Sequence, residues 1–185
     1  KDTSLSDFNK IFNGKEYSEE TILTYSKYWI ESQKKTIIDK GDFGFFKTHN
    51  ARVKINNNYY TNAETTLGFI YIIRDPRDIV LSYSRHINKS IDETMEYILN
   101  GQIMEKKKTN NKMPEITLNW KNHYLSWNKF SSEVPNLFIK YEDLLENFDL
   151  QLRKIIKFFN HNLNITLDAQ DIKIQNIKNS TNFIN

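Results

Sequence analysis

One stretch, FIYIIRDPRDIVLSYSRH at residues 69–86, constrains the fold more than any other. Its first half is an unbroken run of β-branched and aromatic residues, which is typical of a parallel strand covered on both faces. Pro76 follows at a place suited to the first position of a helix, where its missing N–H costs nothing. The stretch therefore predicts a buried strand, a charged turn and a helix over RDIVLSYSRHI.

Other segments repeat this alternation of strand and helix. FGFFK is expected to form a short buried strand that contains Phe43, Phe45 and Phe46 and ends at Lys47, and NLFIK is expected to form another. The asparagine-rich segment 54–66 is expected to be a loop or loose hairpin. Helices are predicted at 18–34, SIDETMEYIL, EITLNWKNHYLSWNKF, DLQLRKIIKFFN and DAQDIKIQNIKNS. The pattern predicts an α/β fold with a parallel sheet.

Composition excludes several classes of function. With 185 residues and a net charge of only +3, the chain is expected to be one domain that is no nucleic-acid binder. It contains no cysteine, which rules out disulfides and a cysteine nucleophile and favours a reducing, cytoplasmic setting. No apolar run is long enough to span a bilayer.

Polar clusters stand at three predicted strand ends, where parallel α/β sheets bind their ligands. They are Lys47-Thr48-His49, Arg74 to Ser82, and Tyr141-Glu142-Asp143. A guanidinium at Arg74 suits a phosphate, and Ser82 adds a donor about two helical turns later. The alternative is that Arg74 and its neighbours are only paired, solvated charges of a turn.

Lys47 and His49 stand two residues apart at a predicted strand end, so their side chains are expected to share a face. The imidazole of His49 could remove a proton from the hydroxyl or amine of a substrate that accepts a transferred group. The ammonium of Lys47 could stabilise negative charge on the oxygen that leaves in such a transfer. His123 shares a predicted helical face with Trp120 and Trp127, which favours core packing or the wall of an acceptor pocket over catalysis. The four histidines show no ligand spacing, and no metal site is predicted.

These motifs, in this order, resemble the PAPS-dependent sulfotransferases of the cytosolic type and their bacterial relatives. The matching segments are FFKTHN, YIIRDPRDIVLSY, LFIKYEDLLENFDLQLRKIIKFFN and, loosely, STNFIN. The resemblance implies a three-layer, P-loop-like α/β domain with a central parallel sheet flanked by helices. It also implies that PAPS donates sulfate to a hydroxyl or amine of a small acceptor, with PAP as product and no metal.

Residue roles follow from the same resemblance. His49 would be the general base, and Arg74 and Ser82 would hold the 3′-phosphate of the nucleotide. Tyr141 would lie near the adenine. The loosely matched Thr181, Asn182 and Phe183 would also contact the adenine.

The sequence departs from the family pattern at its ends. A Gly- and Ser-rich loop for the 5′-phosphosulfate and a C-terminal Arg-Lys-Gly segment are absent, so residues 1–185 are expected to be one domain incomplete at both ends. Asn50-Ala51 replaces the usual Leu-Pro after Lys-Thr-His. A non-catalytic nucleotide-binding protein of this fold and a P-loop kinase remain the alternatives.

Overall fold

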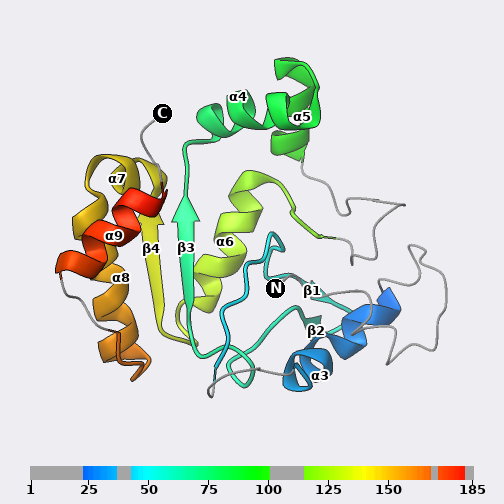
Figure 1. Ribbon diagram of the computed structural model, residues 1–185. Coiled ribbons are helices and arrows are strands. Elements are labelled where there is room, and N and C mark those ends of the chain that lie inside the picture. The colour runs from blue at the N-terminus through cyan, green and yellow to red at the C-terminus, as the bar shows by residue number, and fades with distance from the viewer. Residues whose placement is uncertain (1–22, 37–42, 101–114, 168–170, 182–185) are drawn as a thin grey trace.

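Two parallel strands lie at the centre of the computed structural model, which describes residues 23–36, 43–100, 115–167 and 171–181. Strands β3 (Phe69–Ile73) and β4 (Asn136–Lys140) run side by side in Figure 1. Residue 69 pairs with 136 and residue 73 with 140, so both strands end at one edge. The α/β class and the parallel pairing are confirmed. No further parallel strand occurs in the described ranges, so the wider sheet of a three-layer domain remains a prediction.

One face of β3 packs against helix α6 (Trp120–Phe130). Phe69 and Tyr71 contact a buried cluster that contains Trp127 and Phe130. The rings of Phe69 and Phe130 stack with centroids 5.8 Å apart and an interplanar angle of 6°. This apolar contact fixes α6 alongside the strand that carries the charged turn.

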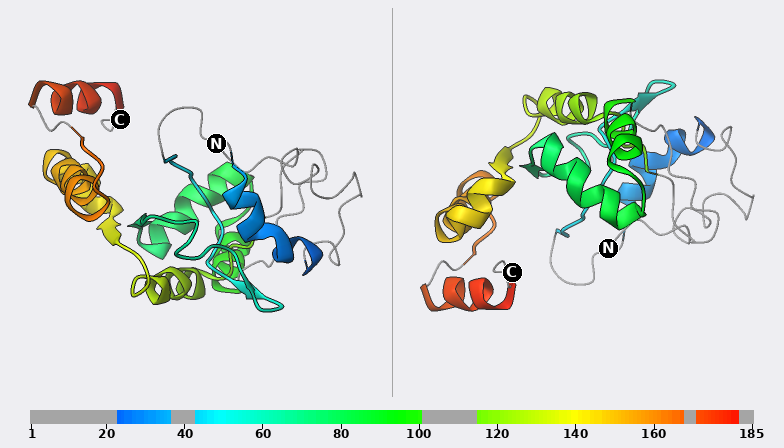
Figure 2. Two further views of the ribbon diagram at one scale, coloured as in Figure 1. Left: turned by 90° about the horizontal axis from the view of Figure 1, so that it is seen from below. Right: turned by 90° about the horizontal axis from the view of Figure 1, so that it is seen from above.

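Helix α8 (Phe148–Asn162) covers the opposite face of the two strands, to which the side chains between those of Phe69 and Tyr71 point. Ile70 packs against a buried cluster that contains Phe158 and Phe159. In both views of Figure 2, α8 lies on one side of the strands and α3 and α5 lie on the other. Ile72 is 55% exposed, however, so the expectation of a strand covered on both faces along its whole length is wrong at this residue.

Helices follow both strands almost without a loop. Strand β3 leads through two residues into α4 (Pro76–Ile87), and β4 leads directly into α7 (Tyr141–Glu146). Helix α5 (Ile91–Asn100) starts with a capping box, in which Ser90 Oγ accepts from the Glu93 N–H at 3.2 Å. Helix α9 (Asp171–Thr181) completes the predicted set.

The N-terminal part confirms two further predictions. The 3₁₀ turn η1 (Ser26–Tyr28) and helix α3 (Trp29–Lys34) occupy the second half of the predicted helix 18–34, whose first residues lie outside the described range. Strands β1 (Lys54–Ile55) and β2 (Asn58–Tyr59) form a hairpin, which was one of the two alternatives expected for this segment. Its two turn asparagines have positive φ angles of 47° and 68°, as a tight hairpin turn requires.

The predicted strand that ends at Lys47 is wrong. Residues 43–50 form no regular element, and Phe45 and Phe46 are 63% and 54% exposed. The ring of Phe45 instead meets Phe159 of α8 edge-on, with centroids 5.2 Å apart. An aromatic run has the same pattern whether it joins a sheet or packs on a helix, and here packing on α8 prevails.

Candidate functional site

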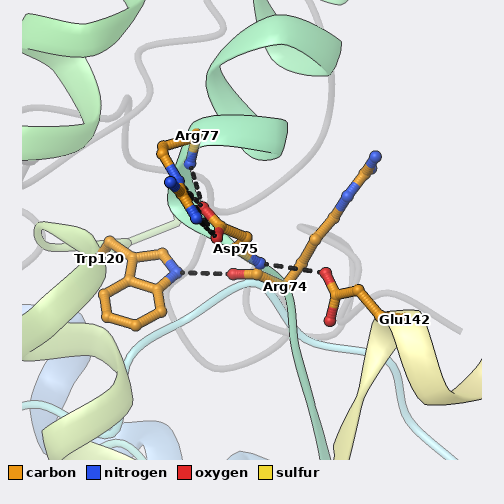
Figure 3. Close-up of polar contacts among 5 residues, drawn as sticks. All are labelled: Arg74, Asp75, Arg77, Trp120 and Glu142. Atoms are coloured by element: carbon orange, nitrogen blue, oxygen red, sulfur yellow. Dashed lines mark hydrogen bonds and ion pairs between the residues drawn. The ribbon is translucent and has the colours of Figure 1, made fainter.

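The turn between β3 and α4 is held by its own charges. Asp75 is the N-cap of α4, and its Oδ1 accepts the backbone N–H of Arg77 at 2.8 Å. The Arg77 guanidinium closes on the same carboxylate, with Nη2–Oδ2 at 2.6 Å (Figure 3). Hydrogen bonds from the Arg77 side chain, and then from its backbone, lower the pKa of Asp75 to about 2. Arg77 is therefore engaged within the turn.

The main chain of Arg74 is anchored from two sides (Figure 3). Trp120 Nε1, at the start of α6, donates to the Arg74 carbonyl oxygen at 3.2 Å. The next backbone N–H, that of Asp75, points to the Glu142 carboxylate of α7 at 3.4 Å. Two helices thus hold the residue that leaves the sheet, and Glu142 links the second and third strand-end clusters.

The side chain of Arg74 extends away from Asp75 and Arg77 (Figure 3). Its Cζ lies 4.5 Å from the centroid of the Tyr141 ring, which is a cation–π arrangement. Its Nε is buried and has no hydrogen-bond partner among the described residues. A buried charged donor without a partner is costly, and such atoms are few in native structures.

Arg74 and Ser82 line the same space. Two hollows, of about 300 and 240 Å³, open on α4, and both residues line both of them. The other lining residues are Asp78, Leu81 and Arg85 for the first hollow, and Ile79, Tyr83 and His86 for the second. The eight-residue spacing in the sequence therefore corresponds to a guanidinium and a hydroxyl at one open, polar site.

Arg85 is a residue that sequence reasoning missed. It lies three positions after Ser82 on α4, so both face the same side of the helix. No ion pair of Arg85 is found within the described ranges. The spacing of Asp78, Ser82 and Arg85 at intervals of four and three was the available signal.

Lys47 and His49 lie in a different environment. Both are exposed, and His49 Nδ1 is 4.0 Å from a carboxylate oxygen of Glu115. Neither residue lines the hollows of Arg74 and Ser82. Their predicted approach to a shared reaction centre remains a prediction.

His123 connects the main chain of His49 to the central strand β3. Its Nδ1 lies 2.7 Å from the hydroxyl of Tyr71, and its Nε2 lies 3.3 Å from the carbonyl oxygen of His49. Burial lowers the pKa of His123, and burial raises the pKa of Tyr71 to about 12. Both side chains are therefore neutral at pH 7. The imidazole ring of His123 also packs on the ring of Tyr71, with centroids 5.6 Å apart.

The predicted adenine contacts are only partly placed. Tyr141 begins α7 and lies against Arg74, whereas Thr181 is the last residue of α9. Asn182 and Phe183 lie outside the described residues. Contacts of all four with a nucleotide remain predictions.

The described residues contain neither a metal-ligand cluster nor a membrane-spanning helix. No group of three or more His, Asp or Glu side chains there is arranged to hold a metal ion. No helix in those ranges is both long and apolar enough to cross a membrane.

Two sulfotransferases are similar to part of this chain. Sulfotransferase 1B1 of the dog is 29% identical over 109 residues, which cover 55% of this chain and 33% of the dog protein. The crystal structure of mouse sulfotransferase SULT7A1 complexed with PAP is 25% identical, with a TM-score of 0.47, and the match covers 60% of this chain and 37% of the mouse chain. The chain thus spans about a third of the length of each relative.

The family model described as "Sulfotransferase domain" matches residues 6–183, which is nearly the whole chain. The match includes all three polar clusters and the two strands that Arg74 and Tyr141 directly follow. The chain therefore belongs to the sulfotransferase domain family.

Proposed function

We propose that this chain binds PAPS and transfers its sulfuryl group to a hydroxyl or amine of a small acceptor, in the cytoplasm. The observation that carries the proposal is that the guanidinium-bearing Arg74 and the hydroxyl-bearing Ser82 line the same two hollows. A phosphate offers acceptor oxygens that match this donor and the serine hydroxyl. The donor set therefore fits the 3′-phosphate of PAPS.

In this proposal His49 takes the proton from the acceptor as the acceptor oxygen or nitrogen attacks sulfur. The bond between sulfur and the bridging oxygen of PAPS breaks, and PAP leaves. Lys47 supports the negative charge that develops on the bridging oxygen. Tyr141 supports Arg74 and, with Thr181, Asn182 and Phe183, contacts the adenine.

Calorimetric titration of PAP into the full chain tests the phosphate site. We expect the wild type to bind, and Arg74→Ala to bind about 10- to 150-fold more weakly because an arginine–phosphate contact is lost. Arg77→Ala is the matched control, because its guanidinium is already engaged by Asp75 and is 88% exposed. A folded wild type that binds no PAP contradicts the proposal.

Adenosine 5′-monophosphate, which lacks the 3′-phosphate, makes the test specific. The wild type should prefer PAP to this nucleotide, and Arg74→Ala should lose most of that preference. Labelled PAPS incubated with phenols, sugars and amines then tests transfer, which His49→Ala should abolish. Binding of PAP without any transfer would favour a non-catalytic nucleotide-binding protein, and Mg²⁺-dependent ATP binding without PAP binding would favour a kinase.

A further inference from the structure

Helix α6 makes hydrogen bonds to the main chain of two of the predicted clusters. Trp120 Nε1 donates to the carbonyl of Arg74 at 3.2 Å, and His123 Nε2 lies 3.3 Å from the carbonyl oxygen of His49. Trp127 Nε1 donates to the next carbonyl, that of Asn50, at 3.0 Å. Residues 120, 123 and 127 follow intervals of three and four, so they lie on one face of the helix.

The direction of the hydrogen bonds at His123 is determined by its partners. The carbonyl of His49 can only accept, so the Nε2 atom of His123 must carry the proton. In the neutral ring Nδ1 is then an acceptor, and the hydroxyl of Tyr71 donates to it at 2.7 Å. Tyr71 thereby selects the tautomer that can hold His49.

The segment around His49 depends on these contacts because no strand ladder supports it. Residues 43–50 form no regular element. The carbonyls of residues 49 and 50 are held by α6, and Ser126 of the same helix accepts the backbone N–H of Arg52 at 3.0 Å. Helix α6 therefore helps to set the path of the main chain at His49, together with the hydrogen bonds of Asn50 and Ala51 to the main chain of Ile116.

We propose that His123 is a positioning residue. Its Nε2–H fixes the main chain of His49 relative to Arg74, because Trp120 of the same helix holds the carbonyl of Arg74. The inference rests on the proposed function, because it gives His49 and Arg74 their roles there. His123 is not itself the proton acceptor, since Nδ1 already accepts from Tyr71 and Nε2 already carries a proton. When one helix holds both the proposed base and the proposed phosphate site, it keeps them in a fixed relative orientation, which catalysis by orientation of reactants requires.

Two substitutions of similar size separate the two nitrogens of the ring. In His123→Gln the amide nitrogen can occupy the place of Nε2 and still donate to His49. In His123→Asn the shorter side chain can occupy only the place of Nδ1, so the bond to Tyr71 is retained and the bond to His49 is lost. Circular dichroism and PAP affinity serve as checks that both variants keep the fold and the nucleotide site.

Long-range ¹H–¹⁵N spectra of the histidine rings test the geometry without any turnover. We expect His123 to be neutral with its proton on Nε2, and the amide signals of His49 and Asn50 to shift or broaden in His123→Asn but not in His123→Gln. A proton on Nδ1, or unchanged His49 and Asn50 signals in His123→Asn, would overturn the proposal. This outcome is decided even if the wild type binds no PAP, in which case only the proposed function fails.

Sulfate transfer from labelled PAPS to 4-nitrophenol supplies the second readout. His123→Asn should lower kcat by about ten- to a hundredfold at an unchanged KM for PAPS, because only the orientation of the base is lost. His123→Gln should recover most of the rate. If His123→Asn abolished transfer while His49→Ala retained it, His123 would be the proton acceptor and the positioning role would be wrong.

Discussion

The guanidinium carbon of Arg74 lies 4.5 Å from the centroid of the Tyr141 ring. This contact joins the carboxyl ends of two neighbouring parallel strands, because Arg74 follows β3 and Tyr141 follows β4. The Tyr141 ring therefore supports one face of the Arg74 guanidinium. The Nε atom of Arg74 is buried and has no hydrogen-bond partner in the described part of the chain. Tyr141 is thus placed to stabilise the cation of Arg74 and to orient its side chain.

Tyr141→Ala is expected to weaken PAP binding, because the guanidinium of Arg74 loses its aromatic support. A cation–π contact of about 0.5–2 kcal/mol corresponds to a loss of roughly 2- to 30-fold in affinity. Tyr141→Phe keeps the ring and is the matched control, which should bind PAP almost as the wild type does. Calorimetric titration measures both, and equal affinities of Tyr141→Ala and wild type would contradict this role.

Arg85→Ala is expected to weaken PAP binding in a salt-dependent manner. Arg85 lines the first hollow beside Arg74 and Ser82, so it adds a second positive charge there. Because the site is open, the difference from wild type should shrink as ionic strength rises. Lys129→Ala removes an exposed charge of α6 that lines neither hollow, and it should leave affinity unchanged. A salt-independent loss, or none, would exclude Arg85 from the anion site.

The elements that carry Arg74 and Tyr141 were predictable because their signals are local. An apolar run, a proline at the first helical position and amphipathic spacing lie within about 20 residues of sequence, and the structure follows them from β3 into α4. The pairing of Arg74 with Ser82 was predictable for the same reason. Two turns of one helix fix their separation.

The environment of His49 was not predictable from local pattern. Its phenylalanine-rich segment packs on Phe159, more than 100 positions later in the sequence, instead of joining the sheet. The spacing of Trp120 and His123 predicted a shared helical face but not its targets. Those targets are carbonyls 46 and 74 residues away, which no periodicity encodes.

Asp75→Asn is expected to reduce stability at neutral pH and to have a much smaller effect near pH 2. The folded-state pKa of Asp75 is about 2, against an ordinary value of 3.8, because Arg77 favours the charged form. The carboxylate therefore stabilises the folded state above pH 4, and this contribution is lost progressively as pH falls below 4 and through about 2. Asparagine is also a good N-cap, so the variant isolates the charge from the cap.

Thermal unfolding of Asp75→Asn and wild type between pH 2 and 7 measures this difference. Asp92→Asn, in the first turn of α5, is the control for a charge near a helix N-terminus and should show a smaller difference. A gap between the Asp75→Asn and wild-type midpoints that stayed constant across this range would show that the interaction with Arg77 is not the cause.

Glu133→Ala is expected to destabilise the fold, because it leaves the buried guanidinium of Arg52 without its carboxylate partner, close to the segment that carries His49. Arg52 is only 4% exposed in its side chain, and it binds both carboxylate oxygens of Glu133 at 3.0 Å. Its Nε donates to the carbonyl of Thr61 at 3.2 Å, and its Cζ lies 3.9 Å from the centroid of the Phe130 ring. These remaining contacts moderate the loss to about 2–3 kcal/mol.

Urea unfolding tests this against Glu31→Ala, which breaks the exposed pair with Lys35 on α3 and should cost no more than about 0.5 kcal/mol. Arg52→Met combined with Glu133→Ala should recover part of the stability, because an apolar side chain of similar length replaces the stranded charge. If Glu133→Ala were as mild as Glu31→Ala, the ring of Phe130 and the carbonyl of Thr61 would suffice to hold Arg52. In that case the carboxylate would be dispensable for the fold beside His49.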